Sequence, residues 1–146
     1  MIKKPSLNIM QQYAALKRDY NYGDIKIIGD RLIWEGKLKS SPIGDEYLIK
    51  ISYKKNDVPK IFVLQPENLK LPEGKNRLMH VYDHEKQRLC LYYPDAKEWT
   101  NKKTIASTIL PWAIEWLYHY EIWLITGNWT GGGIHPSDEK DKSEIK

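Results

Sequence analysis

The chain has 146 residues, of which 41% are hydrophobic and 29% charged, with a formal net charge of +4. This size and mixture are typical of one globular domain with its own core. The apolar stretch 104–129 is interrupted by Glu115 and Glu121, which argues against a membrane-spanning helix. The N-terminus lacks the apolar segment of a signal peptide, and a single cysteine makes no internal disulfide, so we expect a cytoplasmic protein.

The first 80 residues are mildly basic, but their lysines and arginines are spread along the chain, with no run longer than two. Charge alone therefore gives weak support to nucleic-acid binding, which remains an alternative that would use lysines and exposed aromatic rings. The chain has 6 Trp and 10 Tyr but 1 Phe. Because Trp and Tyr combine apolar bulk with a polar tip, this bias favours partly solvent-exposed surfaces and interfaces.

The first predicted element is an amphipathic helix over residues 8–20. Ile9, Tyr13, Leu16 and Tyr20 recur at helical spacing, and Asn8 or Ser6 suits the N-cap.

Four strands are predicted next, over residues 25–28, 31–39, 47–53 and 60–65. The second and third alternate apolar and polar side chains, and the fourth is more uniformly apolar. Because the connections are short, the strands are expected to form an antiparallel meander with one covered face.

Residues 66–101 are predicted to be a long irregular loop, and loops of this length in a compact domain often carry the function. Residues 104–126 are predicted to be helical, with Pro111 either starting a second helix or kinking one long helix. Trp112, Trp116 and Trp123 share one side of it, as core residues or as a docking surface. The pattern predicts an α+β domain over residues 1–134 and a flexible tail over 135–146.

Cys90 lies in the long loop and has two interpretations. A lone cysteine is commonly a buried, inert side chain. Alternatively, its thiolate attacks acyl groups and forms a thioester that can pass the acyl group to an amine. Its place in a long polar loop favours the nucleophile.

The order of helix, meander, loop and helix resembles the ubiquitin-conjugating enzyme fold over about residues 8–125. In that family a His-Pro-Asn motif lies ten positions before the catalytic cysteine, and here His80 lies ten positions before Cys90. Leu91 follows the cysteine and Trp99 comes nine positions after it, as is common in the family.

Five segments, together with Trp99, resemble more closely the stand-alone conjugating-like proteins of short type II CBASS anti-phage operons, namely 89–92, 110–113, 115–117, 120–121 and 126–129. This resemblance implies a thioester-forming acyltransferase that accepts the C-terminus of its operon's cyclic-oligonucleotide synthase, an enzyme resembling animal cyclic GMP-AMP synthase. The acyl group would then pass to an amine. The same resemblance allows a catalytically weak adaptor that binds the synthase.

The chain departs from the motif, because Val81 and Tyr82 stand where the family has Pro-Asn. That Asn supports an oxyanion or positions the loop, and Tyr82 or Asp83 is expected to replace it. His80 is expected either to order the loop by hydrogen bonds or to activate Cys90.

Asp95 is either a solvated loop charge or a base for the attacking amine, and Trp99 is expected to brace the loop against the sheet. His84 is expected to be solvated. A zinc site of His80, His84 and Cys90 is disfavoured because it lacks a fourth ligand. No cofactor and no metal ion are expected.

Overall fold

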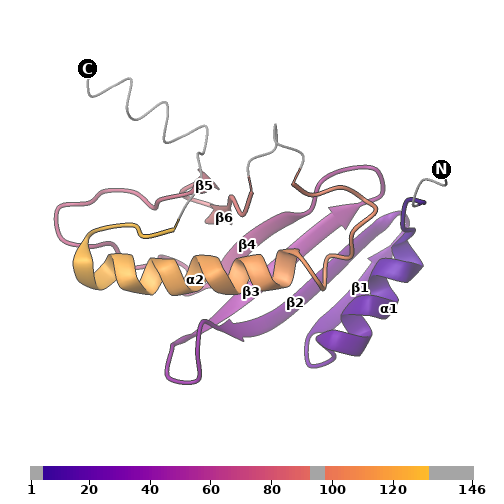
Figure 1. The fold of residues 1–146 in the computed structure, drawn as a ribbon, viewed down its shortest axis with the longest axis horizontal. Helices are drawn as coiled ribbons and strands as arrows, with labels where there is room; N and C mark the ends of the chain where they lie inside the picture. Colours follow the sequence, from indigo (N-terminus) through magenta and orange to yellow (C-terminus); the bar gives the residue numbers. More distant parts are fainter. Residues whose placement is uncertain (1–4, 93–97, 132–146) are drawn as a thin grey trace, which may run out of the picture.

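The computed structural model describes residues 5–92 and 98–131, to which every structural statement below applies. Two helices pack on one face of a six-stranded antiparallel sheet with strand order β1-β2-β3-β4-β6-β5 (Figure 1). This is the predicted α+β architecture. In chain order the elements are α1 (Ile9–Asp19), β1 (Asp24–Ile28), β2 (Arg31–Lys39), β3 (Glu46–Lys54), β4 (Lys60–Gln65), β5 (Val81–Asp83), β6 (Arg88–Leu89) and α2 (Ile109–Thr126).

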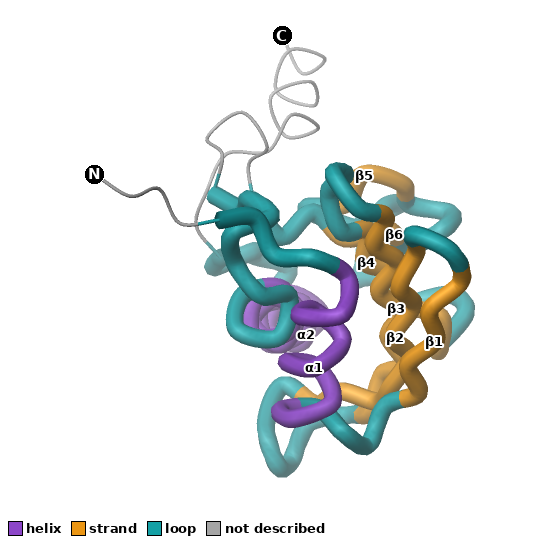
Figure 2. Tube along the Cα trace, turned by 90° about the vertical axis from the view of Figure 1, so that its right-hand side faces the viewer, coloured by secondary structure: helices purple, strands orange, loops and turns teal. Residues whose placement is uncertain are grey.

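The meander of β1 to β4 has the predicted order and orientation. Alternate residues of β2 and β3 are buried, and pairs such as Trp34 with Ile51 lie opposite each other on the covered face. The two helices lie on that face (Figure 2). The core therefore sits between one face of the sheet and the two helices, as the alternation requires.

The segment predicted as irregular, 66–101, contains a short hairpin. Val81 of β5 pairs with Leu89 of β6, and Leu89 also pairs with Ile61 of β4, so the hairpin extends the sheet beyond the meander. Strands of three and two residues are too short to show an alternating pattern. The hairpin matters because Cys90 directly follows β6.

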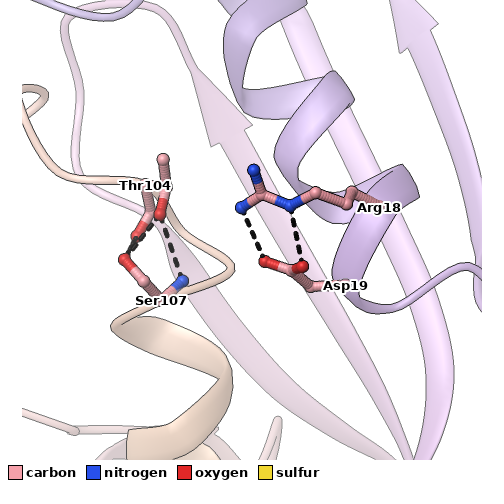
Figure 3. Close-up of polar contacts among 4 residues, drawn as sticks. All are labelled: Arg18, Asp19, Thr104 and Ser107. Carbon is pink, nitrogen blue, oxygen red and sulfur yellow. Dashed lines mark hydrogen bonds and ion pairs between the residues drawn. The ribbon is translucent and has the colours of Figure 1, made fainter.

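α1 begins with a capping box, in which the side chains of Asn8 and Gln11 each accept a hydrogen bond from the other's backbone N–H at 2.8 Å. At its C-terminus Arg18 and Asp19 form an exposed ion pair (Figure 3). This hydrogen-bonded pairing raises the pKa of Arg18 and lowers that of Asp19. Exposed pairs of this kind contribute little to stability.

The last helix is shorter than predicted, because α2 begins at Ile109 rather than near Thr104. The preceding turn is held by side chains: Thr104 and Ser107 share a hydroxyl hydrogen bond of 2.5 Å, and the Ser107 N–H donates to Thr104 Oγ1 at 3.2 Å (Figure 3). Pro111 falls in the first turn of α2, where its missing N–H costs no helical bond. It therefore lies at the start of one helix and kinks nothing.

Gln12 joins α1 to the segment before α2. Its side chain is fully buried, donating from Nε2 to the Lys103 carbonyl at 2.9 Å and accepting at Oε1 from the Ile105 N–H at 2.8 Å. Both groups belong to the chain that leads into α2, so this one amide fixes where the second helix starts relative to the first. Within the described ranges, no helix is long and apolar enough to cross a membrane.

We predict that Gln12→Leu lowers the free energy of unfolding by about 1–3 kcal/mol, because it leaves a buried carbonyl and a buried N–H without partners. Urea denaturation measures the change. The control is Lys17→Leu, an exposed position on the same helix. Equal stability of the two variants would contradict the role given to Gln12.

Candidate active site

Cys90 is held at the end of the β5–β6 hairpin. Its N–H donates to the His80 carbonyl at 3.0 Å, which continues the pairing of the two strands by one step. His80 adopts a left-handed conformation with φ of 50°, and Gln87, in the hairpin turn, does so with φ of 53°. The ten-residue spacing between His80 and Cys90 thus corresponds to the β5–β6 hairpin. The two residues lie side by side where its strands end away from the turn, joined by this backbone hydrogen bond.

The Cys90 thiol is nearly buried, with 7% of the residue exposed, yet it lines a surface cavity of about 170 Å³. Besides Cys90, the lining residues are His80, Leu91, Trp112, Glu115, Trp116, His119, Trp129 and Gly131. The thiol is therefore not sealed within the core.

Two tyrosines bracket the sulfur. The thiol donates to the Tyr92 carbonyl at 3.1 Å. Burial and a side-chain hydrogen bond with Cys90 raise the pKa of Tyr82, and burial followed by charge on Cys90 raises the pKa of Tyr92 to about 12. The Tyr82 side chain therefore lies within hydrogen-bonding reach of the Cys90 side chain. Arg88 lies over the Tyr82 ring at 4.6 Å, a cation–π contact that holds the ring in place.

His80 orders the site through its backbone. Its carbonyl accepts from the Cys90 N–H at 3.0 Å and from Trp116 Nε1, also at 3.0 Å. Its ring lies 5.0 Å from that of Trp129, centroid to centroid. The backbone of His80 thus connects the hairpin directly to α2, and the two roles expected of His80 stay predictions.

The other predicted residues lie elsewhere. Trp99 is buried against Tyr53 of β3 with ring centroids 5.6 Å apart, so it braces the loop against the sheet rather than lining the cavity. His84 is half-buried, and its Nδ1 accepts from the Leu78 N–H at 3.0 Å, so the expectation of a solvated ring was wrong. Asp95 lies outside the described residues.

Of the tryptophans on α2, Trp123 and Trp116 belong to the core, as one interpretation predicted. Trp116 stacks on Tyr120 with centroids 5.4 Å apart, and the Tyr120 hydroxyl donates to the Lys70 carbonyl at 2.6 Å. Trp112 is only half-buried and faces the cavity beside Tyr92. In the parts of the chain that the structure describes, no three His, Cys, Asp or Glu side chains gather to hold a metal ion.

Sequence reasoning missed a buried glutamine. Gln87 is 4% exposed; its side chain accepts from the Leu69 N–H at 2.6 Å and donates to the Val63 and Pro66 carbonyls, each at 3.0 Å. It ties the hairpin turn to β4 and to the chain after β4. A polar residue in a presumed loop carries no sequence signal for such a role, because its partners are backbone groups far away in the chain.

The cavity wall opposite the thiol was also missed. Trp129 lies beyond α2 in a segment predicted only as turns, and its ring lies within 6.1 Å, centroid to centroid, of the rings of His80, Trp116, His119 and Trp123. Its presence in the family-like segment 126–129 was the one available signal.

The helix, the antiparallel sheet and the following helix are consistent with the ubiquitin-conjugating-enzyme-like fold. The family model described as Type II CBASS E2 protein matches residues 12–136, and the chain belongs to that family. A search of curated proteins finds no match.

We predict that Trp116→Phe raises the alkylation rate of Cys90 by iodoacetamide about fivefold, because the lost indole bond to the His80 carbonyl is worth about 1 kcal/mol. The rate is followed by intact mass. Trp123→Phe removes the same volume from the same helix but leaves that bond in place. Acceleration of equal size in both variants would show that general loosening, not the His80 anchor, controls access to the thiol.

Proposed function

We propose that Cys90 accepts the C-terminal acyl group of its operon's cyclic-oligonucleotide synthase as a thioester and passes it to an amine. The observation that carries this proposal is the placement of the chain's one cysteine on the wall of an open cavity, within hydrogen-bonding reach of the Tyr82 side chain. Membership of the type II CBASS E2 family supports the synthase as partner.

The proposed reaction has two steps. In the first, the Cys90 thiol gives up its proton and the sulfur attacks an activated carbonyl, either an adenylate or a thioester; the carbon–sulfur bond forms as the leaving group departs with its electron pair, and the thiol proton passes to that group or to water. In the second, a neutral amine attacks that carbonyl, the carbon–sulfur bond breaks, and the proton that the nitrogen loses passes through a base to the departing sulfur, so that an amide forms and Cys90 is restored as a thiol. The residues described here carry no motif for the adenylation step.

Tyr82 is the residue proposed to replace the motif's Asn. It stands two positions after His80, as the Asn does in the resembled family, and its hydroxyl reaches the reacting sulfur. A phenol that donates to sulfur stabilises negative charge there, and a small shift brings it to the oxyanion that forms on the adjacent carbon. The Arg88 cation over its ring favours the same charge. His80 serves as a positioning residue through its carbonyl.

The second candidate is an adaptor of the same fold that binds the synthase without forming a thioester. The replacement of Pro-Asn by Val81 and Tyr82 favours it. The cavity beside Cys90 favours the transferase, since an adaptor has no need of an approachable sulfur. For the transferase, Asp95 remains the proposed base that receives the amine's proton.

We predict that the protein, co-expressed with its operon's synthase, carries an adduct with the mass of the synthase that thiol reductant removes. Because Cys90 is the chain's one cysteine, Cys90→Ala abolishes every thioester, while Cys90→Ser traps an ester that resists thiols. Intact mass spectrometry with and without reductant makes the measurement. Co-purification of the two proteins with no adduct on either the wild type or Cys90→Ser would establish the adaptor instead.

We predict that Tyr82→Phe slows acyl transfer about 100-fold, the usual cost of removing one oxyanion donor. Single-turnover decay of the purified thioester in the presence of amine measures it. Tyr82→Asn should recover part of the rate, since it restores the side chain of the family's motif. Tyr118→Phe, exposed on α2, is the control. An unchanged rate in Tyr82→Phe would leave the residue as a packing element only.

A further inference from the structure

The last helix, α2, is apolar on two opposite sides. Its seven buried residues, Trp116 and Trp123 among them, face the core, and Figure 2, which views α2 nearly end-on, shows the sheet on one side of it. The side turned away from the core carries a second apolar row, which we call the outer stripe: Pro111, Ile114, Tyr118, Ile122 and Ile125. Because a surface helix is normally polar on that side, an apolar outer side indicates a partner.

The outer stripe runs along the whole helix without a charge in its middle. Successive helical residues are about 100° apart, so its five side chains fall within an arc of about 80°. Tyr118 is 51% exposed and Ile125 is 87% exposed. The two ionised side chains of α2, Glu115 and Glu121, lie at opposite edges of the stripe. Glu121 is also turned toward the β2–β3 connection, from which it accepts hydrogen bonds.

The β2–β3 connection adds one more apolar side chain to this surface. Ile43 is 98% exposed. It lies between Ser40 and Asp45, whose hydroxyl and N–H donate to Glu121, so it is held beside the C-terminal half of the stripe. Together the stripe and Ile43 present on the order of 500 Å² of apolar surface, a size at which an exposed patch marks an interaction site.

The spacing of the stripe indicates which partner covers it. Pro111 and Ile125 each lie seven positions from Tyr118, and Ile114 and Ile122 each lie four positions from it. When two identical helices pack antiparallel about Tyr118, Pro111 of one copy therefore lies opposite Ile125 of the other, and Ile114 lies opposite Ile122. This self-complementarity is what an interface with two-fold symmetry requires, whereas an unrelated partner imposes no such symmetry.

We propose that the outer stripe is the interface of a homodimer, in which α2 packs on α2 of a second copy, antiparallel about Tyr118. Ile43 of each copy then lies beside the helix of the other. The two faces bury on the order of 1,000 Å² together, the lower limit for a specific interface, so the dimer is reversible. Glu115 lies at the edge of the stripe and also lines the Cys90 cavity, so the interface borders that cavity.

The dimer forms without any thioester, so its test is independent of the mass experiment above. Sedimentation velocity of the purified chain from about 2 to 200 µM should show a monomer that becomes a dimer. Ile125→Glu should weaken the dimer at least tenfold, because it places a carboxylate in each of two symmetric apolar contacts. Ile28→Glu is the matched control, since Ile28 is 63% exposed on β1. A monomer at every concentration, or equal weakening by both substitutions, would overturn the proposal.

The antiparallel register is tested by disulfide cross-linking. In a Cys90→Ser background, Tyr118→Cys and Ile125→Cys each supply the chain's one thiol. Residue 118 lies on the two-fold axis and meets its own copy, whereas the two copies of residue 125 are roughly 20 Å apart along the helices, too far for a disulfide. Under a mild oxidant, non-reducing electrophoresis should show a covalent dimer of Tyr118→Cys alone. Equal cross-linking of both variants, or of Ile125→Cys alone, would contradict the arrangement.

Discussion

The His80 carbonyl oxygen is the point at which the hairpin and the last helix are joined. It accepts one hydrogen bond from the Cys90 N–H and one from the Trp116 indole, so a single atom joins the end of β6 to α2. The left-handed backbone at His80 turns that carbonyl toward both donors. The cavity, the Tyr82 contact and the order of the aromatic walls all depend on this junction.

Around the junction, the buried side-chain amides of two glutamines hydrogen-bond to backbone groups and hold segments that lie outside the helices and the main strands. Gln12 fixes the segment before α2 against α1, and Gln87 fixes the hairpin turn against β4 and the chain beyond it. Each amide hydrogen-bonds to backbone groups far away in the chain, which keeps those buried polar groups paired. Where the structure describes them, the segments around Gln12 and Gln87 are therefore held by side-chain hydrogen bonds as well as by packing.

The meander and α1 were predictable because their signals are local: alternation in β2 and β3, and an N-cap at Asn8. The β5–β6 hairpin was not predictable, because strands of three and two residues are too short to show an alternating pattern. The apolar residues within 104–108 continue the helical spacing, and for that reason the predicted helix began too early. The pairing of His80 with Cys90 followed from spacing and resemblance. The roles of Trp129 and Gln87 could not be predicted in this way, since they arise from contacts between distant parts of the chain.

Glu121 has a consequence for the geometry of the whole site. Its carboxylate accepts hydrogen bonds from the Ser40 hydroxyl, the Asp45 N–H and the Tyr47 hydroxyl, so the β2–β3 connection grips α2 at one angular position. Successive helical residues are about 100° apart around the axis. One residue added or lost between Trp116 and Glu121 would rotate the indoles of the first half of α2 away from Cys90. The Glu121 hydrogen bonds therefore constrain the number of residues between these two positions more strictly than the identity of those residues.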